Sequence, residues 1–336
     1  MQLIGITMKL RRQDESGSIT TVVALCLVVL IGLVALVVDT GYVMNIRNEL
    51  QNAADAAALA GARSLFLSSL QAGEPNWIAA QEAATDVVRS NRSSNQPLLD
   101  AQVQVGYWNL ISKMLQPTNI ANTANDLPAV MVTVSKVSGS NGGPVALAFA
   151  PVLGIDTMAV GAKAMAVIGY PKEVDPGEAF PLAIYEGLVQ EYWDKAPPLS
   201  IKIGSKYHYP TSEAGQWTSF KVDANDVPTI RDLMEYGNPA PLEVGKDKIW
   251  IQPGTKTTLY NDVANMIGQI VLCAVVRDLS SHAFVDLLGF VPFQIEAVSG
   301  GSDKYIQGHF VPNHLVPNSR PGGPEYGALT PPRLVQ

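Results

Sequence analysis

The feature that most constrains this chain is a run of twenty uncharged, mainly aliphatic residues near its start, from Ile19 to Val38. An α-helix rises about 1.5 Å per residue, so such a helix is roughly 30 Å long, the thickness of the hydrocarbon core of a bilayer. The run carries no charged residue along its whole length. It therefore predicts a transmembrane helix, which we assign to residues 18–38.

Charges on the two sides of the run predict its orientation. Lys9, Arg11 and Arg12 precede it, whereas the first basic residue after it is Arg47. Basic residues near a membrane end favour the cytoplasmic side. We therefore expect residues 1–17 to form a cytoplasmic N-terminus and the bulk of the chain to be exported.

A cleaved signal peptide is the main alternative to a retained anchor. Its apolar region is typically about 7–15 residues long and ends in a small-residue cleavage site. Here the run is longer, and Asp39-Thr40-Gly41-Tyr42 follows it at once. We therefore predict a permanent anchor bounded by Ile19 and Val38. Asp39 should lie at the membrane interface, where a carboxylate resists entering lipid and so fixes the depth of the anchor.

The helix is expected to continue beyond the membrane, because residues 39–70 contain no proline and are rich in good helix formers. Ala53, Ala57 and Gly61 stand four residues apart on one face, where a second helix or a sheet can approach closely. Two interpretations are open: the face packs inside its own domain, or it docks a neighbouring subunit. The second predicts that Ala57→Leu or Gly61→Leu blocks assembly without abolishing expression.

Downstream, the hydrophobic pattern changes to the two-residue period of strands, first over residues 101–107. Prolines and a glycine between residues 170 and 177 then mark a boundary. Short apolar runs separated by Gly and Pro predict a β-rich region beyond it. We expect an α+β fold with a membrane-proximal α+β domain at residues 39–170 and a β-rich distal domain at 171–311. Six prolines among the 25 residues of 312–336 predict a disordered tail.

Composition and motifs argue against several classes of function. The net charge of −7 provides no basic face for nucleic acid. Cys26 lies inside the predicted span and Cys273 in a distal apolar run, so a disulfide between them is excluded. The sequence lacks the common phosphate-binding, nucleophile-elbow and zinc-protease motifs. We therefore expect no enzymatic activity, and we assign no catalytic, cofactor-binding or metal-binding residue and no cofactor.

The apolar run is preceded by Arg11, Arg12 and Gly17 and followed by Asp39, and the thirteen residues 50–62 read LQNAADAAALAGA. This arrangement resembles the N-terminal segment of TadG-like proteins of the Tad (Flp) pilus assembly machinery. The resemblance implies a non-enzymatic component of pilus assembly or secretion in a bacterial inner membrane, acting as a periplasmic scaffold or minor pilin-like subunit. The implied partners are the membrane and other Tad proteins, with homo- or hetero-oligomers through the anchor helix.

Two departures from the family pattern bear on function. Some TadG proteins carry a D-x-S-x-S metal motif, but the nearest string here, residues 278–282, reads DLSSH and lacks the final Ser. Pseudopilins processed after a Gly have Glu as the fifth following residue, whereas the fifth residue after Gly17 is Val22. Cleavage at Gly17 is therefore not expected. An anchored binding or adhesion module unrelated to pili is the alternative function, and an anchored enzyme ranks after it.

Overall fold

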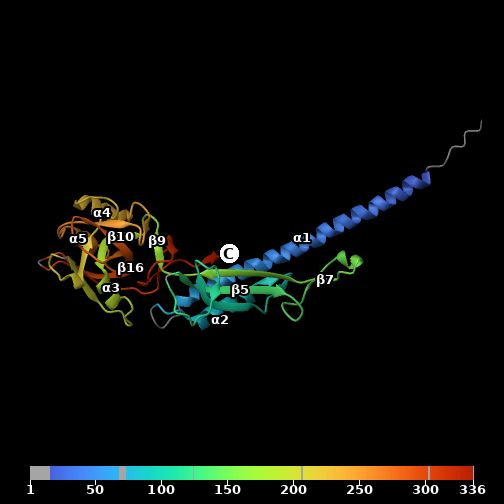
Figure 1. Ribbon diagram of the computed structural model, residues 1–336, viewed down its shortest axis with the longest axis horizontal. Helices are drawn as coiled ribbons and strands as arrows, with labels where there is room; N and C mark the ends of the chain where they lie inside the picture. Colours follow the sequence, from blue (N-terminus) through green and yellow to red (C-terminus); the bar gives the residue numbers. More distant parts are fainter. Residues whose placement is uncertain (1–15, 68–72, 124, 206, 302, 336) are drawn as a thin grey trace, which may run out of the picture.

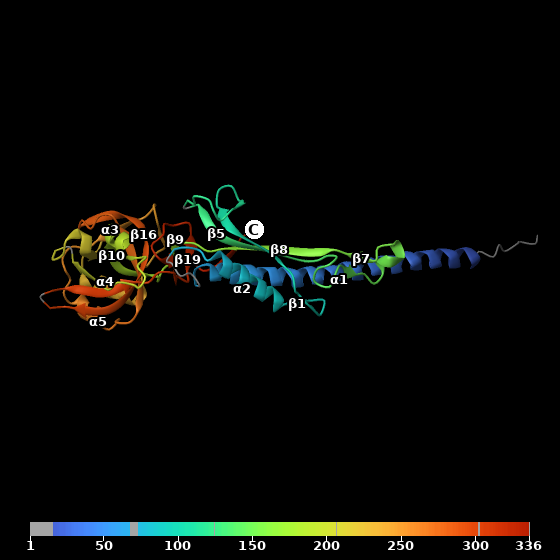
Figure 2. The ribbon, with the colours of Figure 1, turned by 90° about the horizontal axis from the view of Figure 1, so that it is seen from below.

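The computed structural model describes residues 16–67, 73–123, 125–205, 207–301 and 303–335. The molecule is elongated: one long helix projects from an α+β unit, and a β-rich unit lies at the opposite end (Figure 1). Viewed at right angles, the helix runs along one face of the sheet of the α+β unit (Figure 2). This architecture confirms the predicted fold class of a long N-terminal helix followed by a mostly β region.

Helix α1, Ser16–Leu67, runs for 52 residues from the apolar segment into the α+β unit. Its continuity follows from local sequence, since it contains no proline and its second half is dominated by alanine and other good helix formers. Ile19 and Val38, the ends of the predicted span, are 65% and 48% exposed. From Ile46 onward the helix buries a residue at every third or fourth position. One helix is therefore a projecting apolar rod in its first half and a core element in its second.

The α+β unit is an antiparallel sheet with two helices on one face. Helix α2, Trp77–Arg89, begins at Asn76, whose side-chain oxygen accepts a hydrogen bond of 3.0 Å from the Ala79 N–H. The strand order is β21-β8-β5-β3-β4. These strands are β3 (Gln102–Asn109), β4 (Leu115–Gln116), β5 (Asp126–Lys136), β8 (Val160–Val167) and β21 (Arg333–Val335).

The main core of this unit lies between the helices and the two central strands. Successive side chains of a strand point to opposite faces, so every second residue of β5 and β8 is directed at α1. On β8 these residues are alanines, which keep the gap between sheet and helix small. The strand residues in this core include Val130, Val132, Val134, Ala162, Ala164 and Ala166. The opposite face carries a smaller cluster around Trp108 and Met165.

Two short hairpins lie at the end of the unit that faces the projecting half of α1 (Figures 1 and 2). The first consists of β1 (Arg92–Ser93) and β2 (Gln96–Pro97). The second consists of β6 (Val145–Ala146) and β7 (Thr157–Met158), and the loop between them contains the 3-10 helix η1, Ala150–Leu153.

The distal unit is a closed barrel. Strand β16, Ala283–Ser299, pairs with β14, β15 and β17, and β17 also pairs with β11, so β16, β15, β10, β12, β11 and β17 form a ring. The β10–β15 and β11–β12 pairs are parallel and the others antiparallel. Its other elements are β10 (Ala179–Tyr185), α3 (Glu186–Tyr192), β11 (Ile201–Ser205), η2 (Thr211–Glu213), β12 (Ala214–Trp217), α4 (Val227–Tyr236), β14 (Lys248–Ile251), α5 (Leu259–Ala264), β15 (Ile270–Val276) and β17 (Tyr305–Phe310).

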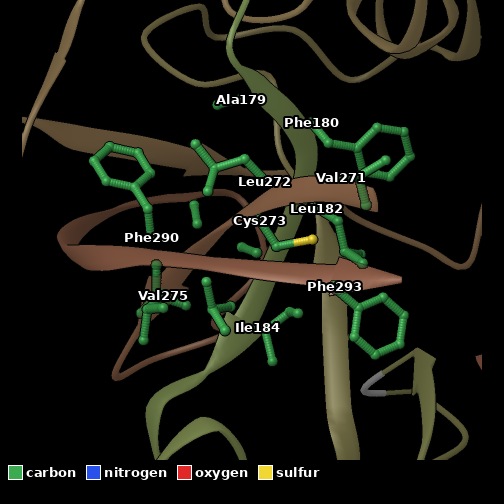
Figure 3. Packing of buried hydrophobic residues seen from close by; sticks show 14 of the residues in the cluster. Ala179, Phe180, Leu182, Ile184, Val271, Leu272, Cys273, Val275, Phe290 and Phe293 are labelled. Carbon is green, nitrogen blue, oxygen red and sulfur yellow. The ribbon is translucent and has the colours of Figure 1, made fainter. Parts of the chain in front are cut away.

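The interior of the barrel is filled by apolar side chains, with the Cys273 thiol among them (Figure 3). Leu182 and Ile184 come from β10, and Phe293 from β16 lies edge-on to Phe310 with ring centroids 5.5 Å apart. A barrel of this small size has an interior just wide enough for its own side chains. The described residues of the barrel interior therefore form a packed apolar core.

The expectation of a disordered tail at 312–336 is wrong for residues 312–335, which form β18 (His314–Leu315), β19 (Ser319–Pro321), β20 (Ala328–Leu329) and β21. Strand β19 pairs with β9 (Pro171–Val174), which also pairs with β13 (Leu242–Glu243). Val316, Tyr326 and Leu329 are buried. The tail is ordered because it buries these apolar residues and finds backbone partners in distant segments, which its proline-rich composition does not reveal.

The boundary predicted near residue 170 falls between β8 and β9. Core residues up to Ile168 pack with α1, and those from Val174 onward pack in the distal unit. The tail contributes to both, since Leu329 belongs to the first core and Ala328 to the second. A division into residues 39–170 and 171–311 therefore omits a segment that both units share.

Candidate functional site

The predicted anchor is the part of α1 that projects beyond the α+β unit. Among the described residues, α1 is the one helix long and apolar enough to cross a membrane, and its most apolar stretch is not buried against the rest of the protein. Large aliphatic side chains are exposed on all sides of this stretch between Ile19 and Val38. In water such a surface is unfavourable by about 25 cal/mol for each Å² of apolar area. The geometry therefore suits an apolar environment around the projecting half.

Asp39 follows Val38 directly, as predicted for a residue at the membrane boundary, but its carboxylate faces the protein and is only 5% exposed. Its two oxygens accept hydrogen bonds from the backbone N–H groups of Ala148, Phe149 and Ala150, at 2.8, 3.0 and 2.7 Å. Burial alone would raise the pKa of Asp39, but the three N–H donors outweigh it and hold the pKa below its ordinary value. Asp39 thus fastens the η1 loop to α1.

The face predicted from Ala53, Ala57 and Gly61 lies inside the α+β unit. Ala53 and Ala57 have no exposed surface. A Cβ added at Gly61 would lie 2.9 Å from the Ala80 carbonyl oxygen on α2 and 2.9 Å from Val130 Cγ1 on β5. Of the two interpretations of this face, the structure therefore agrees with the first, in which the face packs inside its own domain. In this conformation the three residues are not available to a neighbouring subunit.

Polar contacts that the sequence did not reveal attach α1 to the β1–β2 hairpin and to β8. The Ser94 N–H donates to the Glu49 carboxylate at 2.8 Å, and the hydroxyls of Ser94 and Tyr42 are 2.7 Å apart. Gln51 Nε2 donates to the Lys163 carbonyl oxygen on β8 at 3.2 Å. These partners are 45 to 112 positions apart in the chain, so no local pattern signals them.

A polar cluster of Ser200, Glu296 and His309 on the barrel has a geometry unsuited to nucleophilic catalysis. His309 Nδ1 lies 2.6 Å from one Glu296 oxygen, and the Ser200 hydroxyl donates to the other at 2.5 Å. In a catalytic triad the imidazole stands between the carboxylate and the hydroxyl and takes the hydroxyl proton. Here the glutamate stands in the middle, so the serine is not paired with a base of useful pKa.

The cysteine of the barrel is enclosed. The Cys273 thiol has no exposed surface, and burial raises its pKa, which disfavours the reactive thiolate. The described residues contain no group of three or more His, Cys, Asp or Glu residues placed to hold a metal ion.

A cavity of about 270 Å³ lies at the junction of the two units, between Tyr107, Asp126, Tyr170 and Glu325. Asp126 accepts hydrogen bonds from Thr123 and from Asn109 Nδ2, and these lower the pKa of its carboxyl. The Tyr170 hydroxyl donates to the Gly73 carbonyl oxygen at 3.2 Å. The contacts of Asp126 thus lie within the α+β unit, and that of Tyr170 attaches the segment between β8 and β9 to the connection between α1 and α2.

Models of known protein families match the first half of the chain. Residues 17–64 match the family model described as "Putative Flp pilus-assembly TadE/G-like", and residues 45–166 match the model described as "Putative Tad-like Flp pilus-assembly". No curated protein and no solved structure matches the chain. The two matches together cover α1 and the α+β unit as far as β8, and the distal barrel lies outside both.

Proposed function

We propose that this chain, whose residues 17–166 match two family models of Flp pilus assembly, is a TadG-like protein that acts in the Tad (Flp) pilus-assembly system as a non-enzymatic, membrane-anchored periplasmic scaffold. The observation that carries the proposal is the continuity of α1, which is exposed and apolar up to Val38 and buried in a folded unit from Ile46. Such a helix transmits the position of the anchor rigidly to the α+β unit and, through the shared tail, to the barrel.

Orientation follows from charge. Lys9, Arg11 and Arg12 lie before the span, and basic residues near a membrane end favour the cytoplasm. We therefore place the N-terminus in the cytoplasm of a bacterial cell, the span in the inner membrane, and both folded units in the periplasm.

A permanent anchor and a minor pilin-like subunit are the two roles that this helix can serve. In the first the apolar half stays in the bilayer, and in the second it leaves the bilayer to pack in a fibre. Val22 stands at the fifth position after Gly17, where processed pseudopilins have Glu, which favours the permanent anchor.

Partners of the scaffold are other Tad proteins of the same membrane. Because Ala53, Ala57 and Gly61 are enclosed, we assign lateral contacts to the exposed half of α1 instead. Helices associate in lipid where small residues permit close approach, and Ala24, Gly32 and Ala35 lie in that half. Homo- or hetero-oligomers formed through the anchor helix are part of this proposal.

The deciding experiment measures the intact mass and the N-terminal sequence of the protein purified from isolated membranes. An uncut chain of 35.9 kDa in the inner membrane supports the anchored scaffold. A chain that begins at Ser18 contradicts it and assigns the pilin-like role, and a soluble product that begins after Val38 refutes the anchor itself. In parallel, deletion of the gene should abolish pili, and a Gly17→Ala variant, which blocks any cleavage at this site, should restore them.

A further inference from the structure

The loop between β6 and β7 carries an apolar tip that points along the projecting half of α1 (Figures 1 and 2). Its large apolar residues are strongly exposed: Phe149 by 44%, Val152 by 90%, Leu153 by 77% and Ile155 by 52%. The chain has no charged residue between Lys136 and Asp156. Scattered exposed apolar residues are ordinary, but a contiguous patch of them marks an interaction surface.

The tip reaches past the boundary of the predicted span. Phe149 borders a hollow of about 220 Å³ whose other walls are Leu27, Leu30, Ile31, Val34 and Ala35 of α1. These five residues precede Asp39 by 4 to 12 positions, which corresponds to roughly 6–18 Å along the helix axis. The loop therefore lies beside the last turns of the apolar rod and not beyond its end.

Most backbone N–H groups of this loop have hydrogen-bond partners within the protein, which suits an environment that contains little water. An unpaired N–H group in lipid costs several kcal/mol, which normally excludes irregular loops from that environment. Here Asp39 accepts the N–H groups of residues 148–150, and Pro151 has none to satisfy. The turns of the loop satisfy further groups: Leu147 donates to Asp156, Val152 to Phe149, Gly154 to Pro151 and Ile155 to Ala150.

We propose that residues 147–155 form a second membrane contact, which inserts into the periplasmic leaflet next to α1 without crossing it. The occupant of the apolar surface is lipid, because the surface is continuous with the face of α1 that lies in the bilayer. The inference rests on the proposed function in that α1 crosses the membrane. Its consequence is that the protein meets the membrane at two places, which limits how far α1 can tilt away from the loop.

The test measures collisions of nitroxide labels with oxygen, which concentrates in lipid, and with Ni(II)-EDDA, which stays in water. Full-length protein is placed in nanodiscs of phosphatidylethanolamine and phosphatidylglycerol. Labels are attached at Val152→Cys in the tip, Leu30→Cys in the span, and Ile111→Cys, a 76% exposed apolar control in the loop after β3. Cys26 is replaced by Ala, and the fully buried Cys273 is retained.

The expected result is that the labels at 152 and 30 collide several-fold more often with oxygen than with Ni(II)-EDDA, with the reverse at 111. A label at 152 that behaves like the one at 111, while 30 remains in lipid, overturns the inference and leaves the anchor intact. A label at 152 that meets neither reagent also overturns it, because a protein partner then covers the tip. Exposure of 30 to Ni(II)-EDDA refutes the anchor of the proposed function.

Discussion

A single methyl group added to α1 tests whether its small residues serve to bring the elements of the α+β unit together. In Gly61→Ala the new Cβ would lie 2.9 Å from the Ala80 carbonyl oxygen, 2.9 Å from Val130 Cγ1 and 3.1 Å from Ala84 Cβ. The first of these contacts is to backbone, which cannot rotate away. Helix α2 or strand β5 must therefore move, and neither is free to do so without disturbing the core.

The magnitude follows from two opposing effects. Forcing an extra methylene into a packed core costs typically about 1–3 kcal/mol. Alanine is favoured over glycine inside a helix by about 1 kcal/mol. Gly61→Ala should therefore lower the free energy of unfolding of the α+β unit by roughly 0–2 kcal/mol.

The same substitution at Gly41 supplies a matched control on the same helix. A Cβ at Gly41 meets no described heavy atom within 4 Å beyond its chain neighbours and the backbone of α1. Gly41→Ala should therefore stabilise the helix by up to about 1 kcal/mol, because only the propensity term remains. The two variants are predicted to differ by roughly the whole cost of overpacking, about 1–3 kcal/mol.

The assay is hydrogen exchange with mass spectrometry on the full-length protein in nanodiscs, at increasing urea. Peptides from α2 and β5 report the free energy of opening of the α+β unit separately from the barrel. If Gly61→Ala proves as stable as Gly41→Ala, close packing at Gly61 is refuted. If close packing at Gly61 is confirmed, the Gly61→Leu experiment must be interpreted differently. A loss of pilus assembly in that variant would then report misfolding and not a lost docking surface.

Three further predictions concern single contacts. Cys273→Ser should lower the free energy of unfolding of the barrel by about 1–3 kcal/mol, because it buries a hydroxyl among apolar side chains, and urea titration of that variant beside Cys26→Ser measures it. Asp39→Asn should speed amide exchange in the η1 loop, because the NH2 group of the asparagine cannot accept a hydrogen bond where a carboxylate oxygen did. In the wild type the pKa of Asp39 lies below its ordinary 3.8. Protection of the loop amides should therefore hold at pH 5–8 and fall only as the carboxylate is protonated. Deleting residues 331–336 should expose the edge of β8 and speed proteolysis of the α+β unit, while a Leu334→Ala variant, which keeps the backbone pairing, should not.

Local features of the sequence were sufficient to predict α1. Three features predict this helix: its apolar run, the absence of proline, and the spacing of Leu50, Ala53 and Ala57. Each depends only on residues close together in the chain, so each can be recognised from the sequence without knowledge of the fold. The alternation of apolar and polar residues in β3 and β5 can be recognised for the same reason. For the candidate site, the pattern placed Asp39 at the end of the apolar run and identified the small-residue face. It left open what covers that face.

Contacts between distant segments could not be predicted in this way. Thr330 N–H donates to the Gly169 carbonyl oxygen at 2.8 Å, and this contact joins residues 161 positions apart. Prolines in the tail remove donors but do not prevent their neighbours from pairing, so composition alone predicted disorder where the structure has strands. The donors to Asp39 are similarly remote, at residues 148–150.

The remote partner of Asp39 changes the part that this residue plays at the membrane. A carboxylate exposed to water would fix only the depth of the helix, and a single helix still tilts by 0–40° and turns about its axis. Because the Asp39 carboxylate instead holds the loop, an apolar tip is fixed on one side of the helix. Tilting of α1 away from the loop would then lift Val152 and Leu153 out of the lipid into water, at about 1.5–3 kcal/mol for each side chain. Depth and tilt are therefore set together, and the barrel at the far end of the rigid helix acquires a defined direction relative to the membrane.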